Sequence, residues 1–211
     1  MTARISLERS RPRRRTQLER TAETRGAIMR AVVESIAEVG FKRTTASEIA
    51  RRAGVTWGAV QHHFGGKDGI LGAVLEDSFH RFAERLSDIG ADGLPLERRA
   101  ALFVDRAWEH FASRHFRSTF EILQHYAASR PGGAWPGQML RAWDEVWTAL
   151  FGAAPASRGR RLALQHYTIS ALTGLALLRR FEEPSPAVRE RELTLLKDTL
   201  VRELGANGAR A

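Results

Sequence analysis

Apolar side chains recur every three to four residues along most of this chain, and turn residues divide the pattern into segments. Residues 21–39 carry one such stripe, which ends before Gly40, and residues 68–89 carry a longer one. This spacing indicates amphipathic helices. Further helical segments are expected at about 96–113, 116–129, 137–151, 160–181 and 187–204. No alternating strand pattern occurs, so we predict an all-α fold.

Two short helices joined by a tight turn are predicted between the first two stripes, in residues 44–67. Thr45 and Glu48 have the spacing of a capping box at the start of the first. Gly54 stands where a chain leaving a helix needs a left-handed residue. Thr56 can cap the second helix, which ends near Phe64. Helix, glycine turn and helix is the geometry that lays a second helix into the major groove of DNA.

The outward positions of the second short helix are unusual for a purely structural hairpin. They are Trp57, Gly58, Gln61 and His62, and no acidic residue lies between Glu48 and Asp68. An amide, an imidazole and a glycine that allows close approach favour contact with DNA. Trp57 has an alternative role, which is packing against the first short helix.

Positive charge is concentrated at the amino end. The chain of 211 residues has a net charge of +9, and residues 1–70 hold 14 Lys/Arg against 7 Asp/Glu. Such a field attracts polyanions. Residues 1–20 are rich in arginine and poor in apolar residues, so we expect a basic flexible arm. This arm either follows phosphates or a minor groove, or is a solvated tail.

Several classes of site and location are disfavoured by composition. The chain has no cysteine, which excludes disulfides and thiolate metal sites. No apolar run approaches the roughly 20 residues of a membrane span, and no export signal is evident. No nucleophile–base pair, nucleotide cradle or metal-ligand spacing appears. We therefore expect a cytoplasmic protein that is not an enzyme, with no catalytic residues, metal, cofactor or membrane partner.

The amino-terminal third resembles the DNA-binding region of the tetracycline-repressor (TetR) family of bacterial transcription regulators. The resemblance lies in many spaced positions that agree at once. They are Gly40-Phe41, Thr44-Thr45, Ile49-Ala50, Ala53-Gly54-Val55, Gly58, His63-Phe64, Lys67-Asp68 and Ile70-Leu71. It implies a helix-turn-helix domain over 21–66, followed by a larger helical domain for ligand binding and dimerisation over 67–211.

The resemblance also implies roles for individual residues. Thr45 and Lys67 would bind DNA phosphates at or beside helix N-termini. The set that would face the groove is Thr56, Trp57, Gly58, Gln61 and His62. Gln61 stands where the family usually has a phosphate-contacting tyrosine. Its amide can donate to phosphate or read adenine.

Large rings gather in the middle of the second domain, where the resemblance implies an effector cavity. Pockets for small molecules are mostly apolar with a few convergent polar groups. The candidate lining residues are Trp108, Phe111, Phe120, Tyr126, Trp143 and Trp147. Rings at helical spacing can equally form plain core.

The last two helices are expected to form a dimer interface. Leu162, Ile169, Leu172, Leu175, Leu178 and Phe181 share one broad side, and Leu193, Leu196, Leu200 and Leu204 form a stripe on the final helix. Paired across a two-fold axis, these helices would make a four-helix bundle. In the alternative, both stripes are satisfied within one chain.

The leading hypothesis is a homodimeric repressor that binds a near-palindromic operator in double-stranded DNA. A small apolar or aromatic effector would release it by favouring one of two conformations. The alternatives are an effector-independent architectural DNA-binding protein and a helical enzyme with a DNA-binding accessory domain.

Overall fold

The computed structural model describes residues 16–89, 93–129, 134–182 and 184–206, and its regular structure in these ranges is helical. The amino-terminal part contains α1 (Gln17–Val39), the short 3-10 turn η1 (Phe41–Arg43), α2 (Ala46–Ala53) and α3 (Trp57–Phe64). The remainder contains α4 (Lys67–Leu86), α5 (Leu96–Phe111), α6 (Arg114–Ser129), α7 (Ala134–Phe151), α8 (Arg158–Leu178) and α9 (Pro186–Gly205). The predicted all-α architecture is confirmed.

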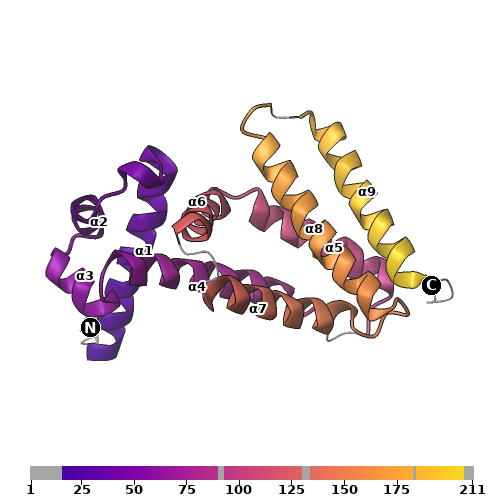
Figure 1. Cartoon of the computed structure of the whole chain (residues 1–211), viewed down its shortest axis with the longest axis horizontal. Coiled ribbons are helices and arrows are strands. Elements are labelled where there is room, and N and C mark those ends of the chain that lie inside the picture. The colour runs from indigo at the N-terminus through magenta and orange to yellow at the C-terminus, as the bar shows by residue number, and fades with distance from the viewer. Residues whose placement is uncertain (1–15, 90–92, 130–133, 183, 207–211) are drawn as a thin grey trace, which may run out of the picture.

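The molecule has two apolar cores, which we call the head core and the body core. The head core joins α1, α2 and α3 to the first half of α4, with Ile122 of α6 added from the other side. The body core joins the second half of α4 to α5, α7, α8 and α9. Figure 1 shows α4 running from the head into the body, while α8 and α9 lie side by side at the far end.

Local capping decides where the head helices begin. α1 starts at Gln17 rather than at about residue 21, because Thr16 and Glu19 form a reciprocal capping box. This box was not among the predicted helix caps. The Glu19 amide donates to Thr16 Oγ1 at 3.2 Å, and the Thr16 amide donates to Glu19 Oε2 at 2.7 Å. Residues 16–20 therefore belong to the first helix and its cap. The rest of the predicted arm lies outside the described residues.

The glycine turn between α2 and α3 is confirmed. Gly54 ends α2 with φ 68° and ψ 30°, the left-handed conformation that glycine adopts without steric cost. Thr45 caps α2 as expected, with its hydroxyl accepting from the Glu48 amide at 3.3 Å. The predicted capping box is only half formed, because the Glu48 carboxylate pairs with arginines instead. The ends of α4 to α9 lie within three residues of the predicted positions.

Candidate nucleic-acid interface and effector cavity

Helix α3 presents a polar, acid-free surface. Val60 is fully buried in the head core and fixes the rotation of the helix. Gly58, Gln61 and His62 are therefore exposed, and their spacing places them side by side on one face. Thr56 is also exposed and caps the helix, since its Oγ1 accepts from the Ala59 amide at 3.2 Å. These four predicted residues are brought together at one surface.

Trp57 departs from the expected outward orientation. Its side chain is partly buried and packs against the head core. The alternative interpretation, packing within the head, therefore describes most of this indole. The helix is only eight residues long, so its first residue lies close to the α2–α3 turn and can reach the core.

Lys67 is held by groups of the protein itself. Its Nζ donates to the Thr44 carbonyl at 2.8 Å and lies 5.1 Å from the centroid of the Phe41 ring. Only the remaining N–H bonds of this partly buried ammonium group can meet a phosphate. Thr45, by contrast, is exposed at the N-terminus of α2. Of the two residues predicted to bind phosphate, Thr45 is accessible, whereas Lys67 is partly occupied by contacts within the protein.

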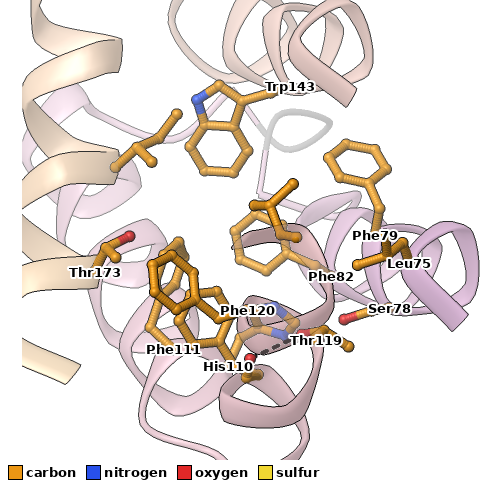
Figure 2. Close-up of a pocket in the computed structure, with 13 residues that line it drawn as sticks. Leu75, Ser78, Phe79, Phe82, His110, Phe111, Thr119, Phe120, Trp143 and Thr173 are labelled. Carbon is orange, nitrogen blue, oxygen red and sulfur yellow. Dashed lines mark hydrogen bonds between the residues drawn. The ribbon is translucent and has the colours of Figure 1, made fainter. Parts of the chain in front are cut away.

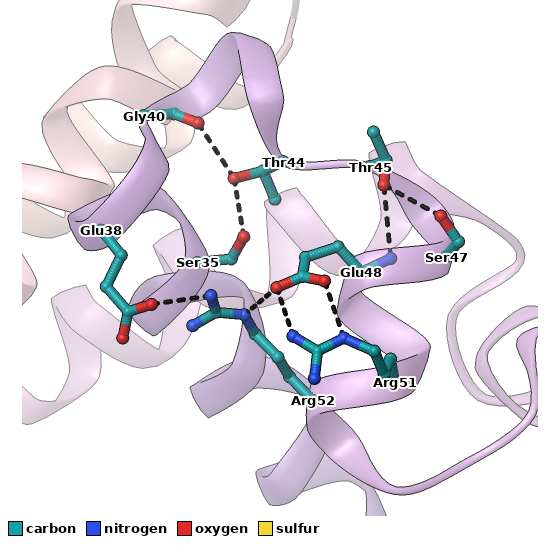
Figure 3. Close-up of polar contacts among 9 residues, drawn as sticks. All are labelled: Ser35, Glu38, Gly40, Thr44, Thr45, Ser47, Glu48, Arg51 and Arg52. Atoms are coloured by element: carbon teal, nitrogen blue, oxygen red, sulfur yellow. Dashed lines mark hydrogen bonds and ion pairs between the residues drawn. The ribbon is translucent and has the colours of Figure 1, made fainter.

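A network of charges ties α2 to α1 (Figure 3). Glu48 accepts from Arg51 Nε at 2.9 Å and Nη2 at 2.8 Å, and it also pairs with Arg52. Arg52 Nη2 in turn lies 2.7 Å from Glu38 Oε2 on α1. Hydrogen bonds from Arg51 and Arg52 lower the pKa of Glu48 to about 2. The negative charges nearest α2 are therefore neutralised by arginines beside the exposed surface.

An aromatic cavity of about 180 Å³ lies where α4, α5, α6, α7 and α8 meet (Figure 2). Its lining residues are Leu75, Ser78, Phe79, Phe82, His110, Phe111, Phe116, Thr119, Phe120, Leu123, Trp143, Ile169 and Thr173. Phe82 stacks on Trp143 with their ring centroids 5.1 Å apart. Burial lowers the pKa of His110 to about 4, with smaller effects of His115 and Arg85, so this imidazole is neutral at pH 7. The cavity therefore carries no charge.

Half of the predicted ring set lines this cavity. Phe111, Phe120 and Trp143 do so, whereas the other three rings do not. Trp147 is only 3% exposed and packs in the body core against Phe103 and Phe151.

The two remaining rings serve other contacts. Trp108 lies beneath two guanidinium groups, and that of Arg189 is 4.4 Å from the ring centroid. The Tyr126 hydroxyl donates to the Asp68 carbonyl at 2.7 Å and so joins α6 to α4. Trp108 and Tyr126 therefore make structural contacts and do not line this cavity.

Some cavity residues were not named from the sequence. Leu75, Phe79 and Phe82 belong to the apolar stripe predicted over residues 68–89. Ile169 and Thr173 come from α8. Their spacing gave no separate signal, because residues that line a cavity and residues that fill a core share one helical period.

Helix α6 contacts both the cavity and the head. Phe116, Thr119, Phe120 and Leu123 line the cavity. Between them, Ser118 Oγ donates to the Val33 carbonyl of α1 at 2.9 Å. The Glu121 carboxylate accepts from the Phe41 amide of η1 at 3.0 Å. One helix therefore touches both regions by alternate faces.

The exposed large apolar side chains concentrate on α8, α9 and the turn after α8. Among the described residues they are Leu18, Leu162, Tyr167, Leu178, Phe181, Val188 and Leu195, and all but Leu18 lie in this region. The stripe predicted on α9 is not exposed. Leu193, Leu196, Leu200 and Leu204 are buried within the chain, where α9 packs against α5 and α8.

Other kinds of site were sought in the described ranges. They contain no group of three or more His, Asp or Glu side chains arranged to hold a metal ion. No helix within them has the length and apolar character required to cross a bilayer.

Comparisons with known proteins agree with this geometry. A family model described as "Bacterial regulatory proteins, tetR family" matches residues 28–74. The HTH-type transcriptional regulator CymR of Pseudomonas putida is 30% identical over 112 residues, which cover 53% of this chain and 55% of CymR. The chain thus spans about half the length of the curated relatives that it matches first.

Solved structures share this fold over most of the chain. The SmeT–triclosan complex has a TM-score of 0.64 and 20% identity, covering 88% of this chain and 96% of that one. FadR from Bacillus subtilis in complex with stearoyl-CoA has a TM-score of 0.62 and 16% identity, covering 86% and 99%. This likeness supports an N-terminal helix-turn-helix unit with a larger helical domain.

Proposed function

We propose that this chain is a regulator of the tetR family that represses transcription as a homodimer bound to a near-palindromic operator. A small apolar or aromatic effector releases the DNA. In this proposal residues 21–66 read DNA, residues 67–211 bind the effector and dimerise, and the protein acts in the cytoplasm.

The observation that carries DNA binding is the exposed face of α3. Gly58, Gln61 and His62 project from one short helix that Val60 anchors, and no acid interrupts this face. An α-helix fits the major groove, where an amide or imidazole can reach base edges. At the N-terminus of α2, which Thr45 caps, backbone amide groups can donate hydrogen bonds to a phosphate.

The aromatic cavity favours an effector-responsive regulator over an architectural DNA-binding protein. Its uncharged lining suits an apolar ligand, and two structural relatives are described in complexes with triclosan and stearoyl-CoA. Ligand binding can reach the head through α6, because this helix lines the cavity and hydrogen-bonds to α1 and η1. The effector must bind the DNA-free conformation more tightly to cause release.

Operator binding is tested by a mobility-shift titration on the DNA upstream of the gene, with random DNA as competitor. Gln61→Ala is expected to weaken specific binding by about 1–3 kcal/mol if the amide reads a base. Gly58→Ala is expected to weaken binding while leaving the fold intact, because the added Cβ meets nothing closer than Thr56 Oγ1 at 3.8 Å. Alanine also has the higher helix propensity.

Gly159→Ala is the matched control for the glycine change. Gly159 is exposed at the start of α8, and a Cβ there meets nothing within 4 Å. The DNA affinity of the Gly159→Ala variant should equal that of the parent protein. Unchanged binding by Gly58→Ala, or the absence of any sequence-preferring complex, would contradict contact of α3 with the groove.

A further inference from the structure

A second hollow, of about 220 Å³, borders the aromatic cavity. It lies between the turn that joins α5 to α6 and the C-terminal end of α8. Phe111, Phe116 and Phe120 line both hollows and form the wall between them. Arg114, Arg117, Arg179 and Arg180 also line the second hollow, which we call the arginine groove.

The arginine groove has an excess of positive charge. No aspartate or glutamate among the described residues lines the groove or the aromatic cavity. Arg179 donates to the Ala112 carbonyl at 3.4 Å and lies 5.8 Å from the Trp108 ring centroid. Arg114 lies within electrostatic range of Glu38. Arg117 and Arg180 form no hydrogen bond or ion pair with a described carboxylate.

The aromatic cavity, in contrast, accommodates only uncharged chemistry. Its polar atoms come from Ser78, His110, Thr119, Thr173 and the indole nitrogen of Trp143, and His110 is neutral at pH 7. An ionised group placed there would lose its hydration without gaining a partner of opposite charge. A ligand that is both apolar and charged must therefore place its charge outside the cavity, and the arginine groove lies directly across the phenylalanine wall.

We propose that the two hollows form one site for an amphiphilic organic anion, with a ring in the aromatic cavity and an oxyanion on Arg117 and Arg180. This inference rests on the proposed function, because it names the chemical class of the effector for the same cavity. The cavity is of the order of the roughly 150 Å³ apolar cavity that binds benzene, so the apolar part of the ligand is about one ring. The charged group of the ligand is a carboxylate or a phosphate, which guanidinium groups bind in charge-assisted pairs.

Phe120 is one of the three rings shared by the two parts, and in this proposal its movement admits the linker. Its ring is half-buried and stacks on Phe116 with a centroid separation of 5.8 Å. Rotation of this side chain opens the wall for a short linker, so affinity depends on the number of carbons between ring and oxyanion.

The experiment is isothermal titration of the full-length protein without DNA. The probes are phenylacetate, phenylpropanoate and phenylbutanoate, each beside the alcohol with the same carbon skeleton, and phenylbutyl phosphate for the second head group. The best acid is expected to bind about tenfold or more tightly than its alcohol, and this advantage should shrink as salt rises. A phosphate-selective groove would show its largest gain with phenylbutyl phosphate.

Substitutions assign the head group to the groove. Arg117→Gln and Arg180→Gln should each lower the affinity of the best anion about tenfold and leave its alcohol unchanged. Arg117→Lys should recover part of the loss, because it restores the charge but not the bidentate geometry. Arg98→Gln is the charge-matched control, since Arg98 is exposed near the other end of α5.

Three results would overturn the inference. They are equal affinities of acid and alcohol, equal losses for both ligands in the groove variants, and no binding by any probe. Equal affinities would assign Arg179 and Arg180 to the ordinary role of cations at the C-terminus of α8. Since no DNA is present, these outcomes leave operator binding untouched, and the mobility-shift titration decides that point alone.

Discussion

Arg25 holds the end of α3 against α1. Its Nη1 donates to the His63 carbonyl at 2.6 Å, and its guanidinium carbon lies 4.3 Å from the centroid of the Phe64 ring. His63 lies in the last turn of α3, where carbonyls lack partners within the helix. The same side chain therefore satisfies a carbonyl and covers an aromatic face, and it orients the helix that carries Gln61.

Arg25→Gln is expected to lower the free energy of unfolding by roughly 1–2 kcal/mol, because a charge-assisted hydrogen bond and a cation–π contact are lost. Operator affinity should fall as α3 becomes less well positioned. The slope of log affinity against log salt should stay the same, whereas loss of a phosphate contact would reduce it by about 1. Chemical denaturation and salt-dependent mobility shifts measure the two effects.

Arg30→Gln is the control on the same helix, because Arg30 is exposed in α1. Its unfolding free energy should match that of the parent. A reduced salt slope in Arg25→Gln alone would assign Arg25 to a DNA phosphate and remove it from the set of positioning residues.

The reach of a side chain limits what the sequence predicts at this scale. Periodicity correctly places Gly58, Gln61 and His62 on the exposed face, because a helix fixes these directions. It also places Trp57 outward, but this side chain packs partly against the head core. Lys67, to which the resemblance gave a phosphate, donates to the Thr44 carbonyl. Those partners depend on tertiary geometry that the spacing of residues does not contain.

At the scale of elements, α3 and α4 meet through backbone. A Cβ on Gly69 would lie 1.8 Å from the Phe64 carbonyl oxygen, so the first turn of α4 needs glycine at this position. Gly65 and Gly66 provide the connection with φ of 72° and 137°, values that side chains disfavour. These three glycines allow the last residue of α3 to rest on the first turn of α4.

Gly69→Ala is expected to destabilise the head by about 1–3 kcal/mol, the range for overpacked sites, because backbone must move to admit the methyl group. DNA affinity should fall with it. Gly72→Ala, one turn later in the same helix, meets nothing within 4 Å and should stabilise by about 0.5–1 kcal/mol. Thermal unfolding of both variants tests the contact, and equal midpoints would contradict it.

The ends of elements are more predictable than the cavity between them. Caps and turns are local, so Thr45, Gly54 and Thr56 mark their helix ends in the sequence. Trp143 and Trp147 are one helical turn apart on α7 and belong to one apolar stripe. The first lines the cavity with residues of α4, α5, α6 and α8, whereas the second packs against Phe103 and Phe151 in the body core. Only the packing of several helices separates these roles.

At the scale of the whole molecule, the exposed apolar face of α8 and α9 is suited to a second copy of the chain. Phe181 is 87% exposed, and Leu178 and Leu195 are more than half exposed. Gly174 has open space where a Cβ would lie, which permits close approach of helices. The stripe predicted on α8 is divided, because Leu162, Leu178 and Phe181 are exposed whereas Leu172 is fully buried and Ile169 lines the cavity. The stripe predicted on α9, Leu193 and its neighbours, packs within the chain instead.

Leu178→Glu and Leu195→Glu are expected to weaken self-association by at least about 100-fold, since each buries an unpaired carboxylate costing about 3–5 kcal/mol. Leu18→Glu is the matched control, because Leu18 is 82% exposed on α1 and away from this face. Sedimentation velocity over a concentration series measures the change. Equal dimerisation of all three variants would place the interface elsewhere.

Helix α6 contacts both the aromatic cavity and the head. In a biosensor built from this protein, these two contacts decide which residues can be altered independently. Phe116, Thr119 and Phe120 share a rigid rod with Ser118 and Glu121, which grip the head. Under the proposed release of DNA by an effector, changing the cavity-lining residues of α6 would alter both ligand selectivity and the coupling to the head. Trp143, Ile169 and Thr173 reach the cavity from α7 and α8, so substitutions at these positions are expected to change ligand selectivity while the contacts of α6 with the head stay intact.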